Sequence, residues 1–292
     1  MPAIVPLIKQ SFKDFNEDRA PMLGAALAYY TLFSIAPILV IATGVAGLVF
    51  GEQAVQGQLS AQLEEMIGPQ GAGAVEMMLA NMHQEGGSIV AIVVGAVTLV
   101  IGATTAFLQL QAALNTVWEV RRQGGGIKGM LLQRVTGLGM VLGIGFLLMV
   151  SLIVSALLSG LQDQLDRILP GGETLWQGVN LLVSLGVFTV LFALIFRYLP
   201  DVEIEWRDVW FGGFVTALLF SIGKFAIGFY LGRGSVGSGY GAAGSLVVLM
   251  VWIYYSAQIV LFGAEITQAN AKMKGRRIAP SKGAVRRTWG AE

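Results

Sequence analysis

Long uncharged apolar stretches alternate with short polar connections along this chain. Each of six stretches contains at most one Asp, Glu, Lys or Arg, at residues 20–51, 86–118, 135–162, 174–196, 209–232 and 234–264. A helix that crosses about 30 Å of hydrocarbon needs about 20 mainly apolar residues. The pattern therefore predicts six membrane-spanning helices, over residues 22–50, 88–110, 131–159, 176–199, 207–231 and 242–268.

The composition agrees with a membrane protein. Hydrophobic residues make up 55% of the 292 residues and charged residues only 13%, compared with about 25% charged in soluble domains. The 39 glycines suit close packing of helices in lipid. We therefore expect an all-α integral membrane protein, a bundle of six transmembrane helices. The chain has no cysteine, which excludes disulfides, thiolate metal sites and cysteine nucleophiles.

The basic residues predict the orientation of the bundle. Sixteen of the 19 Lys and Arg residues fall in the two tails and in the second and fourth connections. The first, third and fifth connections contain only Arg167 and Arg233, and Lys224 lies within a span. Basic residues remain on the cytoplasmic side of bacterial membranes. We therefore expect both termini in the cytoplasm and the bundle in the bacterial inner membrane.

Three parts are predicted along the chain. Residues 1–20 place apolar side chains at helical spacing and predict an amphipathic interfacial helix on the inner leaflet, the alternative being a frayed polar tail. Residues 21–270 form the membrane domain, and residues 271–292 form a basic cytoplasmic tail. Within the membrane domain, the outer loop 51–87 has two periodic pieces that predict short amphipathic helices, either as a lid or as a shield for helix ends.

Small residues and one proline bear on how the spans pack. Gly139 and Gly143 begin a ridge of small side chains on the third span, and Gly228 and Gly232 have GxxxG spacing on the fifth. We interpret both as intramolecular packing seams. Pro37, near the middle of the first span, predicts a kink that is either static or a hinge.

The chain lacks the usual residues of enzymatic chemistry. Its single histidine, His83, lies in the acidic outer loop, where a surface role is expected. Residues 232–237 match GxGxxG, but they join two membrane spans, whereas a dinucleotide site requires a strand before the motif and a helix after it. We therefore expect no catalytic residue, no metal site, no cofactor and no nucleic-acid partner.

Two charged residues near or within the spans are candidates for function. Lys224 lies about 10 Å below the outer end of the fifth span, where it either extends to the interface or faces a polar cavity. Glu265 lies near the inner end of the last span and is expected to pair with a basic residue there. The candidate inner-mouth charge network, structural or functional, comprises Glu119, Arg121, Arg122, Arg197 and Glu265.

Four segments carry a recognisable pattern: ALAYYTLFSIAP at residues 26–37, ALNTVWEV at 113–120, FRYLP at 196–200, and YGAAGSL, WIY and GAE within 240–265. In this order, over about residues 22–270, they resemble the YihY/BrkB family of bacterial inner-membrane proteins. The resemblance implies six spans, which matches the independent count. It also implies links to serum resistance and to export of envelope components, and an old ribonuclease label now regarded as misassigned.

Three functional hypotheses follow. The first is a transporter or exporter of a lipid or another amphipathic or anionic envelope component, and the second is a non-transporting scaffold of an envelope complex. The third, a tRNA-processing ribonuclease, lacks a general acid–base pair, so we expect no enzymatic activity. Expected partners are anionic membrane lipids and envelope proteins, and the oligomeric state is open. The candidate substrate-pathway residues are Tyr29, Tyr30, Ser34, Pro37, Lys224 and Tyr240.

Overall fold

The structure, a computed structural model, consists mainly of long helices. It describes residues 4–50, 72–73, 75–77, 89–123, 129, 135, 137, 139, 143, 173–232, 244–276, 278–281 and 283–287. The helices are α1 (Ile4–Glu17), α2 (Ala20–Phe50), α4 (Ile89–Val117), α6 (Glu173–Tyr198), α7 (Trp206–Gly232) and α9 (Gly244–Met273). Four short strands are β1 (Val120–Arg122), β2 (Val202–Glu203), β3 (Ala279–Pro280) and β4 (Ala284–Arg286).

Five of the six predicted spans coincide with these helices. Three segments in the described part of the chain are long and apolar enough to cross a membrane: Leu181–Tyr198, Trp206–Ile227 and Leu246–Met273. Helices α2 and α4 have 31 and 29 residues without a charge, about 45 Å at the usual helical rise. The predicted span 131–159 lies almost wholly outside the described residues, so the total of six stays a prediction.

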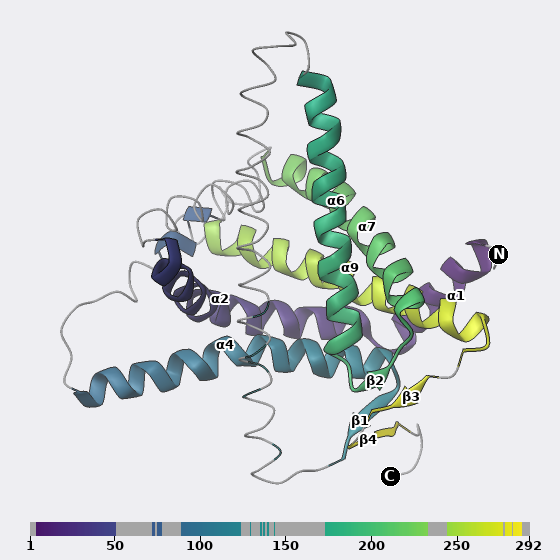
Figure 1. Cartoon of the computed structure of the whole chain (residues 1–292), viewed down its shortest axis with the longest axis horizontal. Helices are drawn as coiled ribbons and strands as arrows, with labels where there is room; N and C mark the ends of the chain where they lie inside the picture. The colour runs from purple at the N-terminus through teal and green to yellow at the C-terminus, as the bar shows by residue number, and fades with distance from the viewer. Residues whose placement is uncertain are drawn as a thin grey trace.

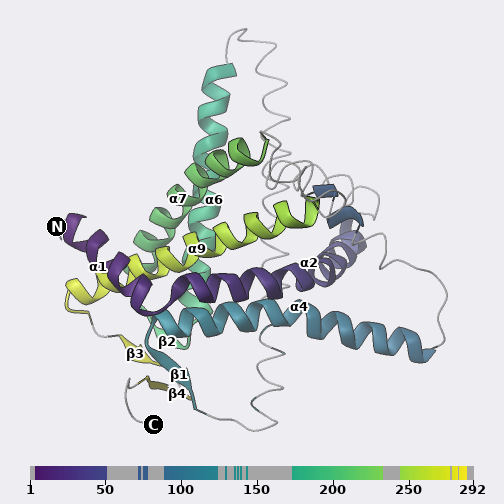
Figure 2. The same ribbon diagram turned by 180° about the vertical axis from the view of Figure 1, so that it is seen from behind.

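The helices converge at one end of the molecule and spread apart from it (Figures 1 and 2). We call this end the junction. It contains the α1–α2 turn, the last turn of α4, the α6–α7 connection and the last turn of α9. Helix α9 is central and contacts α1, α2, α4 and α7, while α6 packs along α7. The junction is therefore the place where residues distant in sequence meet.

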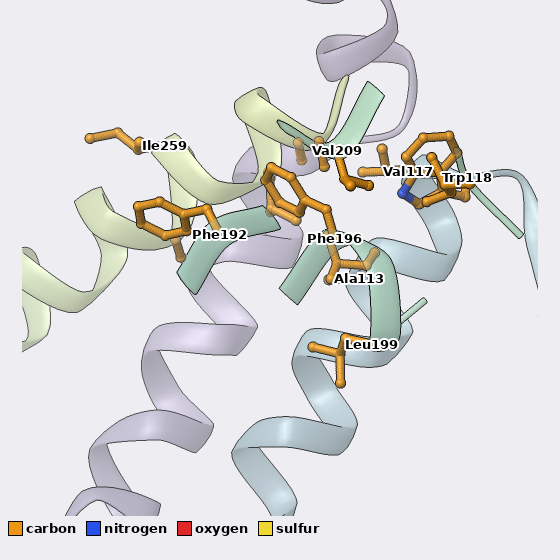
Figure 3. Close-up of a cluster of buried hydrophobic side chains, with 14 of the residues drawn as sticks. Ala113, Val117, Trp118, Phe192, Phe196, Leu199, Val209 and Ile259 are labelled. Carbon is orange, nitrogen blue, oxygen red and sulfur yellow. The ribbon is translucent and has the colours of Figure 1, made fainter. Parts of the chain in front are cut away.

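The main hydrophobic core fills the junction (Figure 3). Leu114 and Val117 of α4 and Phe196 of α6 are fully buried, and Trp118 is 2% exposed. The Phe196 ring stacks on Phe192 one turn earlier, at 6.5 Å between centroids. These residues come from two of the four segments that carry the family resemblance, so both segments contribute to a packed core.

Reciprocal glycine contacts bring α7 and α9 close together. A Cβ at Gly212 would overlap the side chain of Thr267, and a Cβ at Gly263 would overlap Thr216. Each threonine hydroxyl donates to the carbonyl of the glycine four residues before it, at 2.7 Å for Thr216 and 2.6 Å for Thr267. The hydroxyls are thus satisfied within their own helices while the backbones approach, as small residues permit in lipid.

The N-terminal segment is helical, as predicted, and it docks on α9. Leu7 of α1 packs with Ile266 and Ala269 of α9, and Phe15 meets Phe262 edge to face at 5.6 Å. The other apolar side chains of α1 are exposed, including Phe12 at 61%. An exposed apolar face beside a docked one suits a helix at a membrane surface, and that placement stays a prediction.

The C-terminal segment is more ordered than the predicted basic tail. Gly275 (φ 66°) ends α9, and the chain then folds back over the junction. Strand β3 pairs with β2 of the α6–α7 connection, and β4 pairs with β1 after α4, both antiparallel. Residues 278–287 therefore connect two segments that are distant from each other in sequence.

Several packing predictions have mixed outcomes. A Cβ at Gly139 or Gly143 would meet no atom within 4 Å, so the predicted seam there is not seen in the described residues. The side chains around Gly228 and Gly232 lie outside those residues.

In the outer loop, residues 72–73 and 75–77 are helical, as predicted, and Val75 packs against α2 and α9.

Helix α2 continues through Pro37 and is not straight (Figures 1 and 2). Pro37 is buried against α4, where a Cβ at Gly102 would stand 3.0 Å from the proline Cγ. A glycine opposite the proline ring lets the two helices approach at this level. The hinge hypothesis stays a prediction.

Candidate functional site

Two carboxyl groups from opposite ends of the chain meet at the junction. Asp18 lies in the α1–α2 turn beside Arg19, whose φ of 53° is left-handed. Glu265 lies on α9, is 0% exposed and is in contact with the Asp18 side chain. Neither Glu265 oxygen has a hydrogen-bond donor among the described residues. Since adjacent carboxyls disfavour simultaneous ionisation, the pair is suited to hold a proton.

More charges surround the pair. Glu119 follows α4 with a left-handed φ of 54°, and its carboxylate binds Lys272 of α9 at 2.8 Å. The Arg287 amide donates to the Glu119 carbonyl at 2.7 Å, so the C-terminal segment helps to hold this turn. The main cation near the carboxyl pair is therefore already engaged by Glu119.

Burial, reinforced by the negative charges of Glu119 and Asp14, raises the pKa of Asp18 to about 6. The contact with Glu265 and the positive charge of Lys272 act in the opposite direction. An aspartate that titrates near pH 6 changes its charge within a physiological range. The Asp18 carboxyl can therefore take up and release a proton under cellular conditions.

Asp18→Asn should stabilise the protein more at neutral pH than in acid. Because the pKa is raised on folding, Asp18 favours the folded state at low pH, and this contribution is lost as the pH rises from about 4 through about 6. The asparagine side chain of the variant does not ionise, so the variant does not lose this stability as the pH rises. The melting temperature of the variant should exceed that of wild type by an amount that grows between about pH 4.5 and about pH 7.5.

Glu17→Gln is the matched control, because this neighbouring carboxylate is 62% exposed and pairs with Lys13 of the same helix. Its melting temperature should follow that of wild type at every pH. A difference for Asp18→Asn that does not vary with pH would contradict the raised pKa.

Two further polar pairs hold the junction together. Asn115 of α4 exchanges two hydrogen bonds with Asp201 of the α6–α7 connection, at 2.8 and 2.7 Å. Asp208, 1% exposed in the first turn of α7, accepts from Arg276 and from Asn270 of α9. The first pair links α4 to the α6–α7 connection, and the second links α7 to α9 and to the residues that follow it.

The predicted inner-mouth network is divided between different places. Glu119 and Glu265 both lie in the cluster around Asp18 and Lys272. Arg121 and Arg122 lie on β1, opposite Val285 and Ala284 of β4. The strand carries them away from the buried end of α9.

The expected ion pair of Glu265 with an arginine is not present among the described residues. Glu265 instead faces Asp18, with Lys272 as the nearby cation. Arg197, in the last turn of α6, lies over the Trp206 ring at 5.6 Å. It belongs to a different part of the junction because α6 is held on the α7 side of the bundle.

The candidate pathway residues of α2 differ in exposure. Tyr29 and Tyr30 are 52% and 39% exposed, with their rings edge to face at 5.4 Å. Ser34 is 1% exposed. The structure therefore places the tyrosines on an open surface of α2 and the serine inside.

Lys224 and Tyr240 were the other pathway candidates. Lys224 is half-buried on α7, next to Gly223, where a Cβ would overlap the Tyr255 ring of α9. Tyr240 lies outside the described residues. Among the described residues, no group of three or more acidic or histidine side chains could hold a metal ion.

Asp18 and Lys272 are the members of the cluster that the sequence did not indicate. The sequence places Asp18 in the predicted interfacial helix, residues 1–20, and Lys272 in the predicted basic cytoplasmic tail, residues 271–292. A weak signal existed for Asp18, because it is the last acidic residue before a long uncharged span. Nothing in the sequence indicated that the α1–α2 turn would lie against Glu265.

A sequence model described as virulence factor BrkB matches residues 11–287. The chain belongs to the BrkB family. The match includes every described residue of the carboxyl cluster and nearly all of the membrane domain. The membership confirms the resemblance of the four segments and identifies the chain as a membrane protein of that family.

Curated relatives of this BrkB family chain are named UPF0761 membrane proteins. The one from Pseudomonas paraeruginosa is 30% identical over 274 residues, 91% of this chain and 63% of the relative. Those from Alcanivorax borkumensis and Verminephrobacter eiseniae are 28% and 30% identical, covering 88% and 87% of this chain and 58% and 59% of the relatives. The BrkB family chain thus spans about three-fifths of these relatives' lengths. No solved structure matches it.

Proposed function

We propose that this chain is a proton-coupled transporter of an amphipathic component of the bacterial envelope. In this proposal it resides in the inner membrane with the junction on the cytoplasmic side. The distribution of basic residues supports that orientation, because the elements that meet at the junction carry Arg121, Arg122, Arg197, Arg207, Lys272 and Arg276. No enzymatic activity is assigned.

The observation that carries the proposal is the buried carboxyl of Glu265. Its side chain is fully buried within a membrane-spanning helix, and both oxygens lack hydrogen-bond donors among the described residues. An ionisable group in this position is costly, and such residues usually serve ion or proton pathways. A non-transporting scaffold does not need an ionisable side chain at this position, because a leucine or a glutamine could pack there without the cost of burying a carboxyl group.

The position of Asp18 supports coupling between protonation and helix movement. Asp18 lies in the turn that joins α1 to α2, and both helices pack on α9, which carries Glu265. Loss of the proton places two negative charges in contact and favours separation of the α1–α2 turn from α9. Protonation favours their contact, so a proton gradient can bias two arrangements of these helices.

The apolar surface of the spread helices supports an amphipathic substrate. Phe214, Leu218, Ile222 and Phe225 form an exposed stripe along α7, at 43% to 69% exposure. Surfaces of this kind face lipid in a membrane, and a substrate with acyl chains can reach them without crossing water. Anionic lipids and envelope proteins remain the expected partners.

Translocation of a fluorescent phospholipid in proteoliposomes tests the proposal. Purified protein should accelerate transfer of a headgroup-labelled or chain-labelled phospholipid between leaflets, and a proton gradient should alter the rate. Glu265→Gln should reduce the rate to that of protein-free vesicles, because the amide cannot exchange a proton. Glu17→Gln, at an exposed carboxylate of α1, should retain the wild-type rate.

Two results would contradict the proposal. Equal rates for Glu265→Gln and wild type would remove the coupling role of this carboxyl. Wild-type protein that transfers neither zwitterionic nor anionic phospholipids would favour the non-transporting scaffold.

A further inference from the structure

A polar hollow lies at the junction between the end of α6 and the start of α7. Its volume is about 530 Å³, and its lining includes Arg197, Glu203, Glu205, Trp206, Arg207 and Ala279. Ala279 belongs to β3, which pairs with β2, so the folded-back C-terminal segment forms one wall. The residues that line the hollow are different from those of the carboxyl cluster.

The hollow lies at the level where two membrane spans end. The spans Leu181–Tyr198 and Trp206–Ile227 flank it directly. Large aromatic side chains beside it are exposed, with Tyr198 at 61%, Trp206 at 42% and Trp210 at 46%. Exposed Trp and Tyr at span ends mark the boundary between hydrocarbon and headgroups. The hollow therefore opens where phospholipid headgroups are found.

Charges of both signs line the hollow. Arg197 and Arg207 supply two guanidinium groups, which match the planar geometry of phosphate oxygens. Arg197 is held in place by the Trp206 ring beneath it, at 5.6 Å. Glu205 is 3.4 Å from Arg276, so this carboxylate already has a cation. Glu203, exposed on β2, is the carboxylate whose position lets it meet a cation in the hollow.

We propose that this hollow binds the phosphoethanolamine headgroup of a membrane phospholipid. The phosphate is bound by the arginines, the ammonium by Glu203, and the acyl chains lie along the exposed aromatic residues of α6 and α7. A purely anionic headgroup would meet the same arginines but would leave Glu203 facing a phosphodiester of like charge. The site is distinct from the basic C-terminal residues expected to attract anionic lipids, and binding here does not depend on transport.

Lipid retention by the purified protein tests this assignment. Protein in detergent is equilibrated with equal amounts of phosphatidylethanolamine and phosphatidylglycerol, and the bound lipids are quantified by native mass spectrometry. The wild-type protein should retain about three times as much phosphatidylethanolamine as phosphatidylglycerol, or more, as expected from one additional ion pair with the ammonium group. Glu203→Gln should bring the ratio close to one. Arg197→Gln should lower retention of both lipids, and Arg197→Lys should restore it only partly, since lysine lacks the paired donors.

Arg122→Gln is the matched control, because Arg122 is another arginine of the junction but lies on β1 and does not line the hollow. Its lipid ratio should equal that of wild type. Every variant is compared at equal monodispersity and melting temperature. An unchanged ratio in Glu203→Gln, or a wild-type preference for phosphatidylglycerol, would overturn the proposal. Equal binding of water-soluble glycerophosphoethanolamine would also overturn it, because a soluble metabolite and not a lipid would then be the ligand.

Discussion

Phe196→Ala should destabilise the protein by about 3–5 kcal/mol, the usual cost of removing a buried phenylalanine. The ring is fully buried in the core cluster of α4, α6 and α7, which also contains Leu114 and Val209. The melting temperature in detergent should fall by roughly 10 °C.

Phe225→Ala provides the control for this prediction. Phe225 lies on α7 with 69% of its surface exposed, so its truncation leaves no cavity in the core. The melting temperature should change little. Similar losses for the two variants would contradict the placement of the core at the junction.

Gly213→Ala should be destabilising, although alanine is the better helix former by about 1 kcal/mol. A Cβ at Gly213 would stand 2.7 Å from the Thr189 carbonyl oxygen and 2.8 Å from the Ala193 nitrogen, both in the backbone of α6. Backbone atoms cannot rotate away, so α6 and α7 must separate. We expect a loss of about 1–3 kcal/mol in unfolding free energy, measured as a lower melting temperature.

Gly186→Ala is the opposite case on α6 itself. A Cβ there would meet no atom within 4 Å, so only the helix propensity should count. The melting temperature should stay the same or rise slightly. If Gly213→Ala also raised it, the close contact between α6 and α7 would be wrong.

The long uncharged apolar stretches predicted the long helices well, because each span must satisfy its own backbone in lipid. The bounds of α7, Trp206–Gly232, differ by one residue at each end from the predicted 207–231. The charge-free runs marked these helices directly, since almost any charge within a span is expensive. Helix α1 was also recognisable from its apolar spacing.

Contacts between distant segments were not predictable in the same way. Asp18 and Glu265 are separated by nearly the whole chain, and no local pattern relates them. The arginines expected to pair with Glu265 had the right charge and approximate depth, but depth along a helix says nothing about which side of the bundle a residue faces. Arg197 is an example, because it lies over the Trp206 ring and not beside Glu265.

The strand pairing of the C-terminal segment escaped prediction for a different reason. Strands β2 and β3 have two residues each, too few for any alternating pattern to be recognised. Their pairing depends on Gly275 and Gly283, which have positive φ values of 66° and 88° and turn the chain back. Each glycine is unremarkable in a chain with 39 of them.

The two small sheets impose an order on biogenesis. Residues 120–122 and 202–203 emerge from the ribosome long before their partners at 284–286 and 279–280. The membrane helices are therefore inserted before the strand pairs β1–β4 and β2–β3 can form at the junction. Both earlier connections can be joined by β3 and β4 only after α9 has been made, so this end of the helix bundle closes late in synthesis.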